Sequence, residues 1–374
     1  MSTVRDRVLT RGARGLGALI CLLLALLGAV WIVRDLALAR HGTDVWWAWL
    51  GEAPRPREFT AWATSALDPL LVLGALAAAV TALRTAVTAS VATGALLSVA
   101  TATVLLRTPL VWTLNAGWLQ GLDGGLIGRA RWTAVVELVL AVALLAVVAA
   151  GRRTGGGSGR HTGRRPRALP DVAPSAYGVV HAAPHAAEPG APGRPHKGAA
   201  VTAAVLLAAA ALAVVGWEVH WWLVLGGDVY RKGLLGDASV FRAMLEPPVH
   251  WHPAALALLA LAAATAALRR ASWARPAVAG AAALLLGHGT VVLAAAVHTG
   301  TAGRFAALPT EAQLELATAA FLVVAGLTTL ILAGRPGVPD AARDADEVRA
   351  YGSAPGEARP PHAPPPPSTL PPGW

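Results

Sequence analysis

The sequence predicts an all-α integral membrane protein: a polytopic bundle of eight transmembrane helices built as two parallel four-helix repeats. Of its 374 residues, 55% are hydrophobic and only 14% are charged, and the mean hydropathy is +0.54. A soluble protein has about 25% charged residues. Eight apolar runs occur along the chain, and they form two groups of four in residues 15–150 and 199–334.

The first repeat is expected over residues 15–150. Most of its runs approach the ~20 residues needed to cross ~30 Å of hydrocarbon. The first run follows a basic segment and resembles a signal peptide, but it is longer than the roughly 7–15 apolar residues of such a signal. It also has a counterpart in the second half, so we interpret it as a retained helix. The four runs are 15–33, 68–83, 86–106 and 132–150.

The second repeat is expected over residues 199–334, with apolar runs at 199–217, 253–268, 276–297 and 312–333. Residues 76–85 and 261–270 are similar in sequence, and Trp31 and Trp217 end the first run of each half. With an even number of helices, both halves have the same orientation. The pseudo-two-fold axis is therefore expected along the membrane normal.

Three segments lie outside the predicted bundle: the basic N-terminus (1–14), a linker (151–198) and a Pro-rich tail (335–374). The linker and tail lack apolar periodicity, so we expect both to be disordered. The long first loop of each half mixes aromatic and charged residues, which predicts short interfacial helices at 44–50, 57–67 and 236–245.

The distribution of basic residues predicts the orientation. If both termini are cytoplasmic, 20 of the 31 Lys and Arg residues are cytoplasmic, as the positive-inside rule requires. Most tryptophans then lie near the outer boundary. The predicted location is the cell membrane, with N- and C-termini in the cytoplasm.

Composition and motifs give little support for an enzyme. The net charge of +10 would suggest a nucleic-acid partner in a soluble protein. Here the basic residues lie beside apolar runs, so no such partner is predicted. The single cysteine, Cys21, lies inside the first run and excludes an intrachain disulfide. The sequence has no nucleotide-binding motif, hydrolase motif or zinc-ligand spacing.

Three ionisable residues are placed well inside the predicted spans: Glu137, Glu315 and His288. A charge within the bilayer costs about 2.5–3.5 kcal/mol on insertion scales, which makes each residue a candidate site. The two glutamates could form a symmetric proton or cation site near the outer leaflet, and His288, between two glycines, could be a ligand or proton relay. Alternatively, each forms a structural hydrogen bond, which is the interpretation we favour.

A second candidate group lies at the outer face and comprises Asp68, His220, His250 and His252. Asp68 and His252 each precede a proline that opens a helix, and aspartate is a good N-cap. Capping is therefore the expected role of Asp68. The three histidines could form a metal or pH-sensing site, although their spacing matches no metal motif.

Two small-residue faces are predicted to pack against other helices rather than to line a permeation path. Ser90, Gly94 and Ser98 lie on one face, and Gly280 and Gly287 lie on the other.

The leading hypothesis is a non-enzymatic scaffold or envelope-associated membrane protein. Its linker (151–198) and tail (335–374) would contact protein partners, and the bilayer would be its other partner. The first alternative is a transporter or small-ligand-binding protein that uses Glu137, Glu315 and His288. The second is a haem- or quinone-linked oxidoreductase. No cofactor is predicted, because a bis-histidine haem site needs paired intramembrane histidines and the predicted spans contain only His288.

Overall fold

The computed structural model describes residues 7–51, 61–84, 87–119, 122–154 and 196–335. Helices dominate these ranges, as predicted. The strands within them are the three-residue β1 (Arg7–Leu9) and β2 (Arg152–Thr154), which pair antiparallel. The α-helices are α1 (Arg11–Leu38), α2 (Gly42–Trp49), α3 (Leu67–Leu83), α4 (Ala89–Arg107), α5 (Leu110–Thr113), α6 (Gly124–Ala150), α7 (Lys197–Leu225), α8 (Gly227–Leu235), α9 (Trp251–Leu268), α10 (Ala274–His298) and α11 (Thr310–Gly334).

Seven helical segments are long and apolar enough to cross a membrane: α1, α4 with its continuation to Thr113, α6, α7, α9, α10 and α11. These segments indicate a membrane-embedded protein. Helix α3 is apolar but has 17 residues. At 1.5 Å per residue it is about 26 Å long, slightly less than the ~30 Å of hydrocarbon. An eighth span at α3 therefore stays a prediction.

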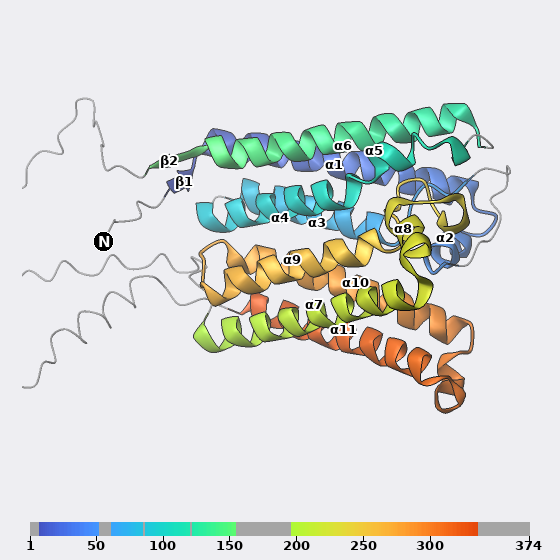
Figure 1. The fold of residues 1–374 in the computed structure, drawn as a ribbon. Helices are drawn as coiled ribbons and strands as arrows, with labels where there is room; N and C mark the ends of the chain where they lie inside the picture. The colour runs from blue at the N-terminus through green and yellow to red at the C-terminus, as the bar shows by residue number, and fades with distance from the viewer. Residues whose placement is uncertain (1–6, 52–60, 85–86, 120–121, 155–195, 336–374) are drawn as a thin grey trace, which may run out of the picture.

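The long helices lie roughly parallel in two groups, shown in Figure 1 as blue to green and as yellow to red. We call residues 11–150 the first half and residues 197–334 the second half. In the first half α1 packs on α3 and α4 packs on α6. In the second half α7 packs on α9 and α10 packs on α11. The halves meet where α10 contacts α3 and α4 and where α9 contacts α4.

The two ends of the bundle differ. We call the end at which α1 begins and α11 ends the linker end, and the opposite end, which carries α2 and α8, the loop end (Figure 1). At the linker end Arg14 donates to the carbonyls of Ala82 and Arg84, and Arg275 donates to the carbonyl of Ala333. These bonds satisfy backbone carbonyls that a helix C-terminus leaves open.

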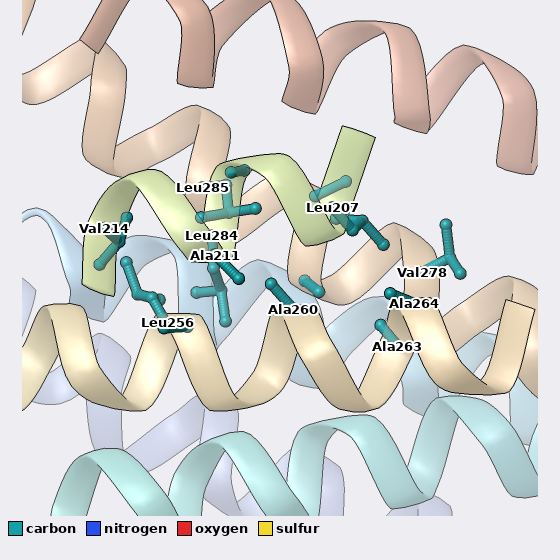
Figure 2. Close-up of a cluster of buried hydrophobic side chains, with 14 of the residues drawn as sticks. Leu207, Ala211, Val214, Leu256, Ala260, Ala263, Ala264, Val278, Leu284 and Leu285 are labelled. Carbon is teal, nitrogen blue, oxygen red and sulfur yellow. The ribbon is translucent and has the colours of Figure 1, made fainter. Parts of the chain in front are cut away.

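Small side chains dominate the helix interfaces. In the second half, Ala211, Ala260 and Ala264 alternate with leucines between α7, α9 and α10 (Figure 2). Between α10 and α11, the Cα of Gly289 faces the carbonyl of Ala319, and that of Gly326 faces the carbonyl of Ala282. Helices in a membrane associate by this kind of close packing, because lipid offers no hydrophobic drive between them.

The loop end only partly matches the predicted interfacial helices. Helix α2 corresponds to the helix expected at 44–50. Residues 61–66 contain no helix, and 57–60 lie outside the described residues. Within 236–245 there is only the 3₁₀ turn η2 (Ala238–Val240), and the longer loop helix is α8, just before it. The remaining 3₁₀ turns are η1 (Gly117–Leu119) and η3 (Ala302–Ala307).

Several helices extend beyond the apolar runs from which they were predicted. Helix α1 continues from residue 33 to Leu38, and α7 continues from 217 to Leu225. Helix α4 includes Arg107. The added residues include Asp35, Arg107 and Glu218, which become part of the buried interior or its edge. The predicted linker and tail fall mostly outside the described residues, apart from β2 and the start of α7 within the linker range and Arg335 at the start of the tail.

Candidate functional site: a buried polar cluster between the halves

Arg107 is the centre of the most polar part of the interior. It lies at the C-terminal end of α4, and the residue is 1% exposed. Its guanidinium pairs with Asp68 of α3 and with Glu137 of α6, where Nε lies 2.8 Å from Oε2. Nη1 also donates to the carbonyl of Leu245 in the second half. One side chain therefore joins three helices of the first half to a loop of the second.

Asp68 is not the N-cap of α3, because that position is Ala66 and Asp68 lies in the first turn. Its Oδ2 accepts hydrogen bonds from the backbone N–H of Ser65 at 2.7 Å and from the Ser65 hydroxyl at 3.2 Å. Its Oδ1 accepts a hydrogen bond from Arg107 Nη2. The N-cap role expected for Asp68 is therefore wrong. Asp68 instead pairs with Arg107 and connects the start of α3 to the end of α4.

Asp35 is a third buried carboxylate. It is fully buried near the end of α1 and accepts hydrogen bonds from the N–H groups of Ala63 and Thr64 and from the Thr64 hydroxyl. Arg34 pairs with it at 2.7 Å. These bonds satisfy buried backbone groups of a non-helical segment, which has no helix or strand hydrogen bonds of its own.

The segment that Asp35 holds also touches the second half. The N–H of Met244 donates to the carbonyl of Trp62 at 3.0 Å, and the N–H of Leu245 donates to that of Ala63 at 2.8 Å. We call Asp35, Asp68, Arg107 and Glu137, with the backbone groups that they bind, the buried polar cluster. Asp68 and Glu137 pair with Arg107, whereas Asp35 pairs with Arg34 and binds the backbone before α3, so the cluster is a connection between helices.

Glu246 follows Leu245 and lies outside the spans. It is half-buried, and burial raises its pKa to about 7; the Arg242 guanidinium opposes this rise and the Asp68 carboxylate adds to it. Glu246 lines a cavity of about 30 Å³ with Asp237 and Trp118 among its other walls. This volume accommodates about one or two water molecules.

In the second half, His252 and His288 are in contact. Their ring centroids are 5.3 Å apart, and the rings are edge to face at 85°. His252 lies in the first turn of α9 and His288 in the middle of α10. The neighbouring glycines of α10 allow close packing, since a Cβ on Gly287 would collide with Leu70 and one on Gly289 would meet the Ala319 carbonyl.

The other outer-face histidines have separate partners. His250 Nδ1 lies 3.1 Å from Glu218 Oε2, which also accepts a 3.0 Å hydrogen bond from Tyr230. His220 Nε2 lies 3.0 Å from Glu311 Oε1. Burial lowers the pKa of His250. Asp68, His220, His250 and His252 therefore do not converge, and the described part of the chain contains no group of three or more His, Cys, Asp or Glu residues placed to hold a metal.

The three intramembrane candidates also lie apart. Glu137 is 3% exposed and pairs with Arg107, whereas His288 contacts His252. Glu315 is exposed near the start of α11, close to Glu311. The sequence suggested that Glu137 and Glu315 could form one site. In the structure Glu137 is beside Arg107 and Glu315 is beside Glu311, so the two glutamates do not form a pair.

Arg107, Asp35 and Glu218 were not identified from the sequence, because each lies just beyond an apolar run. A signal was available for Asp35. The buried positions Leu24, Gly28 and Trp31 of α1 recur at three- and four-residue spacing, and Asp35 continues this stripe. Arg107 likewise follows the buried Thr103 by four residues in α4.

A large cleft also opens between the halves, away from the polar cluster. Its volume is about 700 Å³, and α3 and α4 form one wall while α9, α10 and α11 form the other. Ser98 of α4 packs against Gly280 of α10, so the two small-residue faces predicted to pack do meet. Both residues also border the cleft.

Comparisons of the chain with protein-family models, with curated proteins and with solved structures give no match. Function must therefore be inferred from the residues and their geometry. Two features carry that inference: the internally paired polar cluster and the apolar cleft.

Proposed function

We propose that this chain is a non-enzymatic membrane scaffold or envelope-associated component. The observation that carries this proposal is the pairing of Arg107. Asp68, Glu137 and the Leu245 carbonyl occupy the guanidinium from three directions. A substrate would have to break a buried ion pair to reach these groups, and such pairs are costly to break. The cluster is suited to holding the two halves in a fixed relation.

We further propose eight spans in two parallel repeats, with α3 as the short span. Two matching hydrogen bonds support the repeat. The Trp31 indole donates to Thr133 at 3.0 Å, and the Trp217 indole donates to Thr318 at 3.0 Å. In each case a tryptophan on the first long helix of a half binds a threonine on its last. The order of neighbouring helices within each half is also the same.

The proposed orientation places both termini in the cytoplasm of a cell membrane. It is supported by the basic residues at the linker end and by the tryptophans toward the loop end. In a Cys21→Ser background, a cysteine at Gly117 should react with an impermeant thiol reagent in intact cells. Cysteines at Ser158 and Ser353 should react only after lysis. Labelling at 158 without labelling at 117 would invert the orientation.

The transporter alternative is less well supported, since Glu137, Glu315 and His288 have separate surroundings. The haem-linked alternative gains a histidine pair, because His252 lies beside His288 rather than in a loop. These rings are in direct edge-to-face contact, so a flat macrocycle would have to separate them. No geometry favours either alternative over a scaffold.

Complementation of a deletion strain distinguishes these functions. If the chain is a scaffold, removing residues 336–374 or replacing 155–195 with a neutral linker should abolish complementation at normal membrane abundance. Glu137→Gln should complement, because glutamine keeps a hydrogen-bonding group. A transporter predicts the reverse: tail and linker variants that work, and a Glu137→Gln chain that is abundant, folded and inactive.

A further inference from the structure

The cleft between the halves has the dimensions of a lipid chain. Along α3 its wall runs from Leu70 to Thr81, a rise of about 17 Å at 1.5 Å per residue. Half of the ~30 Å hydrocarbon core is about 15 Å. The cleft therefore extends from the linker end to about the middle of the bundle. Its volume of about 700 Å³ lies within the range of binding sites for small molecules.

The cleft is apolar and accessible from the side. Leucines, alanines and valines form most of its wall, and Ser98, Thr81 and Thr101 contribute hydroxyls. Leu73 lines it and is 62% exposed, so the cleft reaches the outer surface of the bundle. In a bilayer this surface faces acyl chains. A molecule can thus enter from the membrane without crossing water.

Arg275 is the one charged residue among those that line the cleft. It lies in the first turn of α10 at the linker end, next to Trp273. Its Nε and Nη2 donate to the Ala333 carbonyl, and Nη2 also donates to the Arg335 carbonyl. Among the described residues no carboxylate forms an ion pair with Arg275, so its charge is not neutralised. This end of the bundle also carries Arg84 and Arg269. An arginine at the mouth of an apolar cleft is complementary to an amphiphile with an anionic head.

We propose that this cleft binds one acyl chain of an anionic phospholipid from the leaflet at the linker end, with the lipid phosphate beside Arg275. Trp273, at the start of α10 beside Arg275, would then lie at the depth of the headgroups, which indole prefers. The lipid would fill the space between α3 and α10 and support the contact between the halves. The proposal does not depend on the scaffold function, because a transporter with this cleft would bind the same lipid.

The proposal is tested by a substitution whose side chain fills the cleft. Gly74 lines it, and a Cβ on Gly74 meets nothing within 4 Å. Gly74→Phe should therefore occupy the chain site without a clash. Gly216→Phe is the matched control, since Gly216 of α7 also has open space at its Cβ but does not line the cleft. Each purified full-length chain is mixed with equal dioleoyl phosphatidylglycerol and dioleoyl phosphatidylcholine, and native mass spectrometry counts the retained lipids.

We expect wild type and Gly216→Phe each to retain one more phosphatidylglycerol per chain than Gly74→Phe. Equal retention by Gly74→Phe and wild type would overturn the proposal. A wild-type chain that retains no lipid would also overturn it. So would a wild-type chain whose bound molecule, absent from Gly74→Phe, is a neutral non-lipid compound or a second copy of the chain.

The headgroup contact is tested separately. Arg275→Gln should reduce the preference for phosphatidylglycerol over phosphatidylcholine about fivefold, the effect of one basic residue near an anionic lipid. Arg84→Gln removes an exposed arginine at the same end that does not line the cleft, and it should leave the preference unchanged. An unchanged preference in Arg275→Gln would overturn the assignment of the phosphate to Arg275.

Discussion

The two halves connect their second and third long helices in different ways near the loop end. In the first half, Asp68 of α3 and Arg107 of α4 form a buried ion pair that Glu137 extends to α6. In the second half, His252 of α9 and His288 of α10 form a ring contact. Asp68 and His252 both precede a proline in the first turn of their helix. Similar helix pairs can thus be joined by opposite charges or by two aromatic rings.

The two connections also differ in reach. Arg107 binds the carbonyl of Leu245 and so links the first half to the second, whereas the histidine pair lies within one half. A buried ion pair is sensitive to the loss of one partner, because the other charge is then left unpaired in a medium of low dielectric constant. The first half should therefore be the more sensitive to a single substitution.

The largest expected effect comes from Arg107→Met. It leaves Asp68 and Glu137 without a counter-charge and should reduce the free energy of unfolding by about 3–5 kcal/mol. The amount of folded protein in membranes and its melting temperature in detergent measure this loss. The triple variant Asp68→Asn, Arg107→Met, Glu137→Gln removes all three charges and should recover much of the stability. A single variant as stable as wild type would show that the cluster does not hold the halves.

His288→Ala is expected to have the next largest effect. It removes the ring that contacts His252 and leaves a space beside the close-packed Gly287 and Gly289. The cost should be about 2 kcal/mol, at the low end of large-to-alanine changes. The melting temperatures of His288→Ala and Arg107→Met, measured side by side, rank the two connections by their contribution to stability. A greater loss for His288→Ala would reverse the comparison between the halves.

A smaller effect tests the close packing of α10 and α11. An alanine at Gly289 or Gly326 would bring its Cβ to 2.6 or 2.8 Å from a backbone carbonyl oxygen, which must then move. We expect a loss of about 1–2 kcal/mol from overpacking. Gly128→Ala in α6 is the control, because its Cβ meets nothing within 4 Å and alanine favours a helix by about 0.5–1 kcal/mol. Equal melting temperatures for the three variants would contradict the packing interpretation.

The smallest effect concerns pH and the contact between Glu246 and the first half. Because burial raises the pKa of Glu246 to about 7, the folded chain holds this proton more tightly than the unfolded chain. The associated stability is present below the ordinary carboxyl pKa and is lost as pH rises through about 7. Melting temperature should fall between pH 5 and pH 8 in wild type, and less so in Glu246→Gln. Parallel pH profiles would show that Glu246 is solvated.

The sequence was sufficient to predict the long apolar helices, but not the short helices at the loop end or the polar contacts. Long apolar runs identify helices from composition alone, because the bilayer requires them. Arg107 was left out of the predicted span 86–106 because an apolar run ends at the first charged residue. Its partners lie 39 and 30 residues away along the chain, on two other helices. Nothing local indicates that such a charge is neutralised.

Local similarity was also misleading for the two glutamates. Both follow an apolar residue and precede a leucine, which suggested equivalent positions. The tryptophan bonds give a different register. Glu137 follows Thr133 by four residues, whereas Glu315 precedes Thr318 by three, so they lie on opposite sides of their reference threonines. Neighbouring helices fix this register, and a single run of sequence does not contain it.

The bonds between Asp35 and the segment before α3 imply an order of biogenesis. The N–H groups of Ala63 and Thr64 are buried, and their acceptor is the Asp35 carboxylate of α1. A buried backbone group without a hydrogen bond is costly. The segment that leads into α3 therefore depends on an α1 that is already in place. A chain synthesised from its N-terminus meets this requirement, whereas a circular permutant that begins at α3 would have to insert this segment before its acceptor exists.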